Sequence, residues 1–463
     1  MTLEEMRKEV FRIKPKFADI ARMWEDKTLL QYYQQDFSNL HAPSKRILDA
    51  IEQETTSILG SVIGKKAHSA MQHMRWVNTA DHHGLLHHPY FYITALALSH
   101  PSIQKTENVT VTLPFGGISL GNDSFPRGCM FHDRELSPQR IFFKSLKERR
   151  LPVYALSPIT KRDLQREQHH SLSFSLSKDA HEKLQSFFVA LDNNVRVWSQ
   201  ETFSAQLTAM NNVLWHELFA KQRGDFVYLE METVVRRLLL DRHLVSDTDI
   251  FKLLFTPAWQ KVFVTLFNDI PYSHTTHSGT HLFWYVDYQA QTRKRLLITN
   301  GTLTTPEGDV SINLNPECIA QGLTNRTLMP SSVLSLLIIH AVEKLACGGG
   351  ASQLQYLPEF MMQWQLLLAE QGAPSQHMPN SAILCGHQAL FQNGIDGQVK
   401  PSLSTLIDVL LYKKDITTTL DQLLMTTPIA PSVDALIPIL HTLFTRQQNL
   451  QSFPLDIPSL KIM

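Results

Sequence analysis

The stretch Asn108-Val-Thr-Val-Thr-Leu-Pro-Phe-Gly-Gly117 begins with residues typical of a β-strand and ends with residues typical of a turn. β-Branched residues run up to Leu113, which predicts a β-strand, and Pro114 to Gly117 then turn the chain. Three later runs also have β character, at residues 282–286, 295–299 and 309–313. Asn300-Gly301 and Glu307-Gly308 are turn signals between these runs. The sequence therefore predicts several short strands.

Most of the remaining sequence has the three- and four-residue apolar spacing of helices. Such spacing covers residues 4–20, where Pro15 should break the helix, and 44–63, where Ser44 can cap it. Residues 160–270 and the part after 330 are also expected to be mainly helical, with a helix from Ser331 that stops at Cys347-Gly348-Gly349-Gly350. Val153–Leu156 is expected to be a further strand.

These elements predict a helix-rich α+β or mixed α/β fold with a small mixed sheet and a helical C-terminal portion. We expect three parts. They are an N-terminal helical segment (1–66), a mixed α/β core that carries the candidate site (67–330), and a helical C-terminal portion packed on the core (331–463).

Composition narrows the class of protein. Hydrophobic residues make up 43% of the 463 residues, enough for a sizeable core, and 43 basic residues balance 43 acidic ones. A balanced charge argues against a nucleic-acid or anionic-membrane partner. No apolar run reaches the ~18 residues of a membrane span, and the charged N-terminus does not resemble a signal peptide. The four cysteines are widely separated, which favours a soluble protein of the reducing cytoplasm.

The densest chemical signal is a histidine cluster, Asp81-His82-His83-Gly84-Leu-Leu-His87-His88. Imidazole and carboxylate are common ligands of zinc, iron and manganese. In a helix, His83 and His87 would share one face, whereas in a loop Asp81 and His83 could converge. The cluster predicts a metal site formed by Asp81, His82, His83, His87 and His88, with Asp81 and His83 also as catalytic groups. The alternative is that these histidines cap helices, satisfy buried polar groups or face solvent.

The loop after the first strand is a second candidate, because small residues let the backbone approach an anion. Arg127 could bind a carboxylate or phosphate, and His132 could act as a base. Ser119, Asn122 and Ser124 could orient polar groups of the substrate. Gly117-Ile-Ser119-Leu-Gly121 also matches the Gly-x-Ser-x-Gly pattern of a serine nucleophile, although no helix is expected after it. The alternative is a pair of tight turns.

A third group is weaker. His274, His277 and His281 have helical spacing and could complete a metal site begun by residues 81–88. A polar loop is the other interpretation of this segment.

Two hypotheses follow. The first is a metal-dependent hydrolase or transferase that acts on a small polar or anionic molecule and uses a divalent metal such as zinc, iron or manganese. The second is a metal-free protein. It could be an enzyme with His acid–base chemistry, with or without Ser119 as nucleophile, or a small-molecule- or protein-binding protein without turnover. The sequence leaves the substrate and the oligomeric state open.

Overall fold

Four short parallel strands form the central sheet, in the order β12-β1-β2-β5. β1 (Trp76–Asn78) pairs with β12 (Ala346–Gly348) on one side and with β2 (Val109–Thr112) on the other, and β2 pairs with β5 (Asp225–Tyr228). Nearly every residue of these strands is buried, as expected for a parallel sheet covered on both faces. All four strands therefore end at the same edge of the sheet.

The computed structural model describes residues 1–35, 37, 39–85, 88–104, 108–122, 129–270, 282–374, 376, 378–379, 382–393, 403–412, 416–447 and 459–461. Its helices are α1 (Leu3–Ile13), α2 (Pro15–Met23), α3 (Leu29–Tyr33), α4 (Lys45–Leu59), α5 (Ser61–Met74), α6 (Tyr92–Leu98), α7 (Lys161–Ser171), α8 (Lys178–Asn193), α9 (Val195–Trp198), α10 (Phe203–Arg223), α11 (Met231–Leu238), α12 (Asp249–Phe255), α13 (Pro257–Phe267), α14 (Pro316–Thr324), α15 (Ser332–Leu336), α16 (Gln353–Glu370), α17 (Leu406–Tyr412), α18 (Ile416–Met425) and α19 (Ile429–Thr445). The other strands are β3 (Cys129–His132), β4 (Pro138–Ile141), β6 (Phe283–Asp287), β7 (Thr292–Arg295), β8 (Leu297–Thr299), β9 (Thr302–Thr304), β10 (Ser311–Asn313), β11 (Leu328–Pro330), β13 (Phe391–Asn393) and β14 (Ser459–Lys461).

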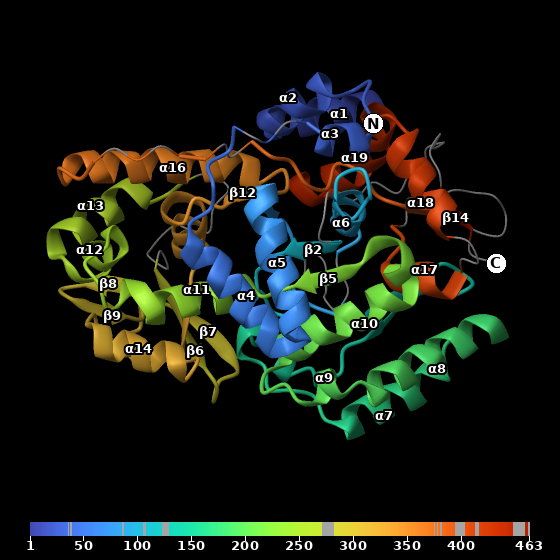
Figure 1. The fold of residues 1–463 in the computed structure, drawn as a ribbon, viewed down its shortest axis with the longest axis horizontal. Helices are drawn as coiled ribbons and strands as arrows, with labels where there is room; N and C mark the ends of the chain where they lie inside the picture. Colours follow the sequence, from blue (N-terminus) through green and yellow to red (C-terminus); the bar gives the residue numbers. More distant parts are fainter. Residues whose placement is uncertain are drawn as a thin grey trace.

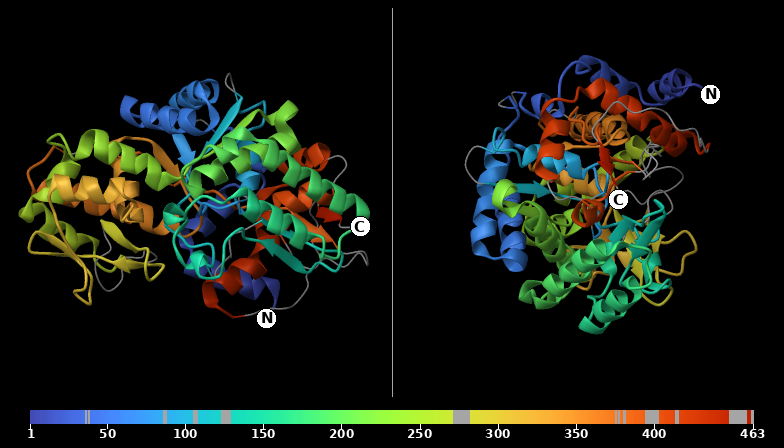
Figure 2. Two further views of the ribbon diagram at one scale, coloured as in Figure 1. Left: turned by 90° about the horizontal axis from the view of Figure 1, so that it is seen from below. Right: turned by 90° about the vertical axis from the view of Figure 1, so that its right-hand side faces the viewer.

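Helices surround the central sheet on all sides (Figure 1). The α4–α5 hairpin crosses in front of it, and α5 packs on β1 and β2 while α10 packs on β5. One end of the molecule holds α12, α13 and α14 with the two three-stranded antiparallel sheets, and the opposite end holds α8 and α17 (Figures 1 and 2). The helix-rich mixed α/β class predicted from the sequence is confirmed.

Two local predictions are wrong. Residues Val153–Ala155 form a short 3-10 helix, not a strand. The run Cys347-Gly348-Gly349-Gly350 is not a helix stop, because its first half belongs to β12. A Cβ atom at position 348 would lie 2.8 Å from the ring of Trp76 on β1, so glycine serves there as a strand residue beside a large side chain.

The helix breaks predicted at the N-terminal end are confirmed. α1 ends before Pro15, which occupies the first turn of α2. The Ser44 hydroxyl accepts a hydrogen bond from the N–H of Ile47 and so caps α4. Gly60, with a φ of 97°, separates α4 from α5.

None of the helices in the described ranges alone combines the length and the apolar character that a membrane span requires. α12 and α13 reach that composition only as a pair, across a bend of 92°.

Candidate functional site

The segments that follow the four parallel strands meet at the carboxyl edge of the sheet. In open parallel sheets this edge is where ligands bind, beside the point at which the strand order reverses. Here the chain continues from β1 to β2 on one side of β1, whereas β12, a strand from much later in the chain, pairs with β1 on its other side. Gln353, at the start of α16, donates a 2.7 Å hydrogen bond to the Thr79 hydroxyl and so joins the segments after β12 and β1.

A small cavity of about 70 Å³ lies at this edge. Segments after all four strands contribute to it, namely His82 after β1, Gly117 after β2, Glu232 after β5, and Tyr356 after β12. Strands β6, β7 and β11 close the opposite side. The lining residues are His82, Phe115, Gly117, Ile118, Glu232, Trp284, Arg293, Met329, Pro330, Ser332, Val333, Tyr356 and Phe360. The walls are therefore mainly apolar, with a few polar groups, as in small-molecule sites.

Glu232 is the buried acid of this cavity. Its two carboxyl oxygens accept hydrogen bonds from the main-chain N–H groups of Gly116 and Gly117, both at 2.7 Å. Burial, together with the neighbouring Glu230 carboxylate, raises the pKa of Glu232 to about 8. At neutral pH its carboxyl group is therefore mainly protonated and able to donate a proton.

Arg293 supplies the positive charge. Its guanidinium lies 4.1 Å from the centre of the Trp284 ring and donates to the carbonyl of Gly117. Burial lowers the pKa of Arg293 to about 10, which still leaves it charged at neutral pH. The described residues offer it no carboxylate oxygen within 4.0 Å. A half-buried guanidinium of this kind is suited to a carboxylate or phosphate of a ligand.

The histidine cluster is held in place by Asp81, which is buried. One of its oxygens accepts the N–H of His82 at 2.7 Å, and the other accepts the N–H of His88 at 2.8 Å and the hydroxyl of Tyr228 at 2.7 Å. The acidic residue of the predicted metal set thus shapes the loop between β1 and α6.

The histidines of this loop lie in different environments. His82 is partly exposed and lines the cavity. His83 is buried, its Nε2 donates to the carbonyl of Tyr228 at 3.1 Å, and burial lowers its pKa. The ring of His88 stacks on Tyr90, with the ring centroids 4.7 Å apart. His87 lies outside the described residues, as do His274, His277 and His281 of the weaker candidate.

Of the four predicted substrate-binding residues, the structure describes two, Ser119 and Asn122. Ser124 and Arg127 fall outside the described part of the chain. Ser119 forms a bridge to Pro152 through its main chain, and its carbonyl accepts the N–H of Asn122 at 3.2 Å. Neither Ser119 nor Asn122 is among the described residues that line the cavity.

His132, predicted to be a base, lies on β3 and does not line this cavity. Its Nδ1 is 2.9 Å from Asp408 Oδ2, and the Gln392 amide lies 2.7 Å from both atoms. Its sequence neighbour Asp133 instead accepts two main-chain N–H groups of the following turn, at 2.9 Å each. The buried contacts of His132 therefore tie β3 to β13 and α17.

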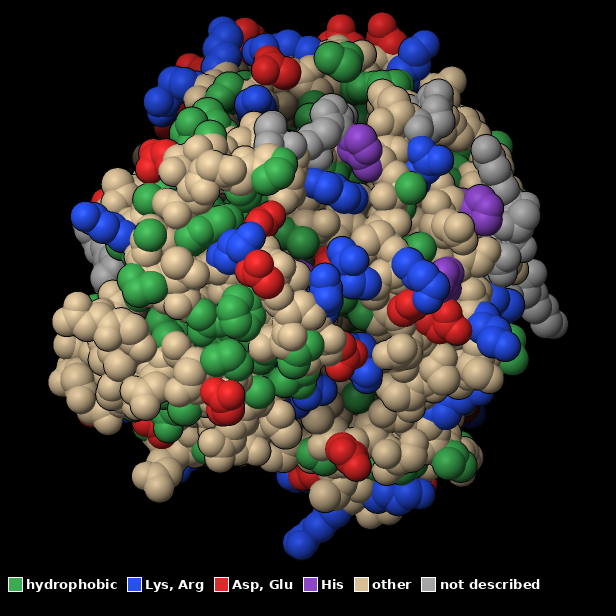
Figure 3. Space-filling view, turned by 60° about the vertical axis from the view of Figure 1, so that its left-hand side comes forward, with side chains coloured by type: hydrophobic (Ala, Val, Ile, Leu, Met, Phe, Trp, Pro, Cys, Tyr) green, Lys and Arg blue, Asp and Glu red, His purple; other side chains and the backbone are tan. Residues whose placement is uncertain are grey.

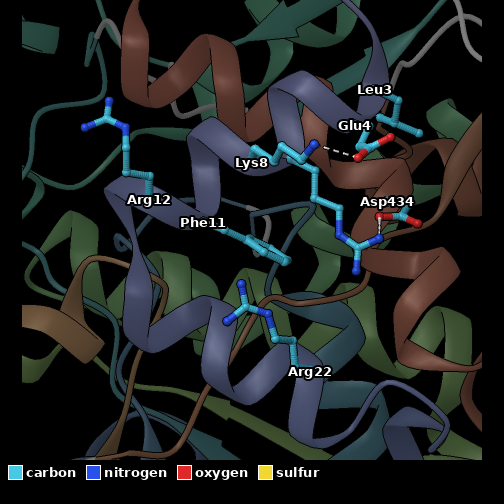
Figure 4. Close-up of a pocket in the computed structure, with 8 residues that line it drawn as sticks. Leu3, Glu4, Lys8, Phe11, Arg12, Arg22 and Asp434 are labelled. Atoms are coloured by element: carbon cyan, nitrogen blue, oxygen red, sulfur yellow. Dashed lines mark ion pairs between the residues drawn. The ribbon is translucent and has the colours of Figure 1, made fainter.

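A larger hollow lies elsewhere, between α1, α2 and α19 (Figure 4). It measures about 780 Å³ and contains Arg7, Lys8, Arg12 and Arg22 around Phe11. Lys8 pairs with Glu4 at 2.7 Å and Arg7 with Asp434 at 3.5 Å, so much of its positive charge is neutralised. None of the predicted site residues lines it, and we place the candidate site at the sheet edge.

Sequence reasoning missed Glu232 and Arg293. Glu232 follows β5, a four-residue strand that a mainly helical interpretation of residues 160–270 did not anticipate. Arg293 belongs to the expected β region but is one of several basic residues in a hairpin. The sequence feature that could have indicated Glu232 is the pattern Glu230-x-Glu232, two carboxylates directly after the apolar run Phe226–Leu229.

Gly116 gives a test of how tightly this edge is packed. A Cβ atom at position 116 would lie 2.7 Å from Cδ and 2.8 Å from Cγ of Glu230, a buried side chain. We expect Gly116→Ala to lower the free energy of unfolding by about 2 kcal/mol, measured by chemical denaturation. Gly121→Ala is the matched control from the same loop, because its nearest atom would be 3.4 Å away. Equal stability of the two variants would contradict the packing described here.

No family model matches the chain, and no curated protein is significantly similar to it.

Proposed function

We propose that the protein is an enzyme that acts on a small molecule bearing a carboxylate or phosphate, bound in the cavity at the carboxyl edge of the sheet. The observation that carries the proposal is the pair Glu232 and Arg293, a protonated buried acid and a cation without a carboxylate partner among the described residues, which line one cavity. Arg293 would bind the anionic group, and the aromatic walls would hold the apolar part of the ligand.

In this proposal Glu232 is the general acid. Its two N–H contacts from Gly116 and Gly117 fix the carboxyl group, and its raised pKa keeps the proton available near neutral pH. His82, on the opposite loop of the same cavity, is the candidate for a second proton-transfer group. Hydrolysis or group transfer, in which a leaving oxygen must be protonated, is the reaction class that fits this arrangement.

A metal-dependent form of the reaction, with zinc, iron or manganese held by residues 81–88, stays a separate proposal. The Asp81 carboxylate already accepts three hydrogen bonds, which leaves few of its lone pairs for an ion. The contacts of the described residues therefore favour acid–base chemistry at Glu232 over metal chemistry at Asp81.

We also propose a reducing compartment such as the cytoplasm, and a small molecule rather than nucleic acid or membrane as the partner. All four cysteines are free, which supports the first point. On the face drawn in Figure 3, Lys and Arg side chains are interspersed with Asp and Glu, which supports the second.

A substrate screen with Glu232→Gln tests the proposal. The screen would follow hydrolysis of p-nitrophenyl phosphate, p-nitrophenyl acetate and a panel of small phosphate and carboxylate esters. We expect turnover of at least one class, a loss of about 10²–10⁴-fold in kcat for Glu232→Gln, and little change for the exposed Glu217→Gln. Because the protonated form is the active one, wild-type kcat should fall as the pH rises through about 8. Turnover that survives in Glu232→Gln would contradict this role.

A further inference from the structure

We propose that Asp49, Glu52 and His68 form a binding site for a divalent cation of the zinc type, separate from the cavity at the sheet edge. Asp49 and Glu52 lie one turn apart on α4, and His68 faces them from α5. Two carboxylates and one imidazole are a ligand set that zinc uses in sites that keep a position open for water.

The ligand atoms are close enough to converge. His68 Nδ1 is 2.9 Å from Glu52 Oε2 and 3.8 Å from Asp49 Oδ1, and all three ligand atoms lie within 4.8 Å of one another. Ligands bound at about 2.0–2.2 Å from one ion lie at most about 4.4 Å apart. A small side-chain rotation therefore brings all three onto one ion.

The imidazole provides a second observation. His68 Nδ1 is shielded from solvent, yet it forms no hydrogen bond, despite its short distance to the Glu52 carboxylate. Its close contact is with the Glu52 carboxylate, outside hydrogen-bond geometry, so this shielded nitrogen faces the proposed ligand oxygens. An ion between the imidazole and the carboxylates would satisfy this nitrogen.

The backbone beneath the site is closely packed. Gly64 lies one turn before His68 on α5, and a Cβ atom there would be 2.8 Å from the carbonyl oxygen of Glu52. The two helices are therefore in close contact beside the three ligands, which limits their relative movement. Pre-positioned ligands lose less conformational freedom on binding.

The local charge is also suitable. Lys45, which is largely exposed, contacts the other oxygen of Asp49 at 2.6 Å. Asp49 Oδ1 remains directed toward His68. A bound cation would therefore join α4 to α5, the helix that precedes β1. The role is structural and does not depend on the proposed enzymatic activity.

The test is zinc binding to untagged full-length protein freed of metal with a chelator, followed by isothermal titration calorimetry with zinc chloride. We expect one equivalent to bind, a rise in Tm on binding, and affinity reduced by more than about 100-fold in Glu52→Gln/His68→Asn. His73→Asn is the matched control, because this exposed histidine lies on the same helix and its Nδ1 contacts the carbonyl of Ser69 at 2.7 Å. His82→Asn reports on the separate histidine cluster.

The zinc affinities of the wild type and the three variants decide whether Asp49, Glu52 and His68 bind the cation. Loss of binding in the double variant, with binding retained in His73→Asn and His82→Asn, supports the site. Retention of the full affinity in the double variant, loss of binding only in His82→Asn, or the absence of zinc binding by the wild type would each overturn it.

Discussion

Replacing His387 with Leu is expected to stabilise the protein at neutral pH and to make it less sensitive to acid. His387 is buried beside the rings of Tyr32 and Tyr33, with centroid distances of 4.7 and 5.9 Å, and within the described part of the chain neither of its ring nitrogens has a hydrogen-bond partner. Burial lowers the pKa of His387 to about 3 from an ordinary 6.5. At mildly acidic pH, His387 therefore stays neutral in the folded protein but binds a proton in the unfolded chain.

The sign of the effect follows from proton linkage. Between pH 6.5 and about pH 4, the unfolded state binds a proton at His387 and the folded state does not, so stability falls as the pH falls. The loss from this one residue is ~3 kcal/mol over that interval. Leu has no proton to bind and leaves no buried nitrogen unsatisfied, so a gain of about 1 kcal/mol is expected at pH 7.

Urea denaturation at several pH values measures this effect as the difference between the wild type and His387→Leu. The difference should grow by ~3 kcal/mol from pH 7 to pH 4. His169→Leu, at an exposed histidine on α7, should leave the acid dependence unchanged. A difference between wild type and His387→Leu that does not vary with pH would contradict the buried, neutral state of His387.

His340 should contribute to acid sensitivity in the same direction. Its Nδ1 accepts the N–H of Cys347 at 3.0 Å, and its Nε2 lies 3.3 Å from the carbonyl oxygen of Pro379, so the ring is held as one neutral tautomer. Burial lowers its pKa to about 4. The His387→Leu variant should therefore still lose stability as the pH falls, because it keeps His340.

Replacing Arg293 with Met is expected to weaken the binding of anionic ligands without unfolding the protein. Met can keep the apolar contact with Trp284, while the charge that has no carboxylate within 4.0 Å is removed. A charge-assisted hydrogen bond contributes about 1.5–3 kcal/mol, so affinity should fall about 10- to 100-fold. A thermal-shift screen of small carboxylic acids and phosphate monoesters would identify ligands, and calorimetry would then compare their affinities.

Arg22→Met is the matched control for this experiment. Arg22 also lies against an aromatic ring, 5.3 Å from the centre of Phe11, but in the larger hollow of Figure 4. Ligands found in the screen should bind this variant as they bind the wild type. Ligands that lose affinity only in Arg22→Met would move the site to the N-terminal helices.

Much of the fold could be predicted because its signals are local. Pro15 and Ser44 act within one helical turn, and the alternating Val and Thr residues of β2 indicate a strand without any knowledge of their neighbours. The strands β1, β5 and β12 were missed because each has only three or four residues, all buried. Their strand conformation depends on pairing with segments distant in the sequence, as for Gly348 beside Trp76.

The candidate site was predictable only in part, for the same reason. The glycine loop and His82 do line the cavity, and their segments stood out as Gly116-Gly117 and as a run of histidines. Glu232 and Arg293 come from segments more than 100 residues further along the chain, and only the fold places them beside that loop. The sequence also could not show that Asp408, rather than Asp133, is the partner of the His132 ring.

The most direct test of the proposed site is a crystal structure of the protein with the tightest-binding anion from the ligand screen. We expect the anionic group to lie within hydrogen-bond distance of the Arg293 guanidinium, with the Glu232 carboxyl group facing the ligand. An anion bound instead among the arginines of α1 and α2, or at residues 81–88 without contact to Arg293, would contradict it.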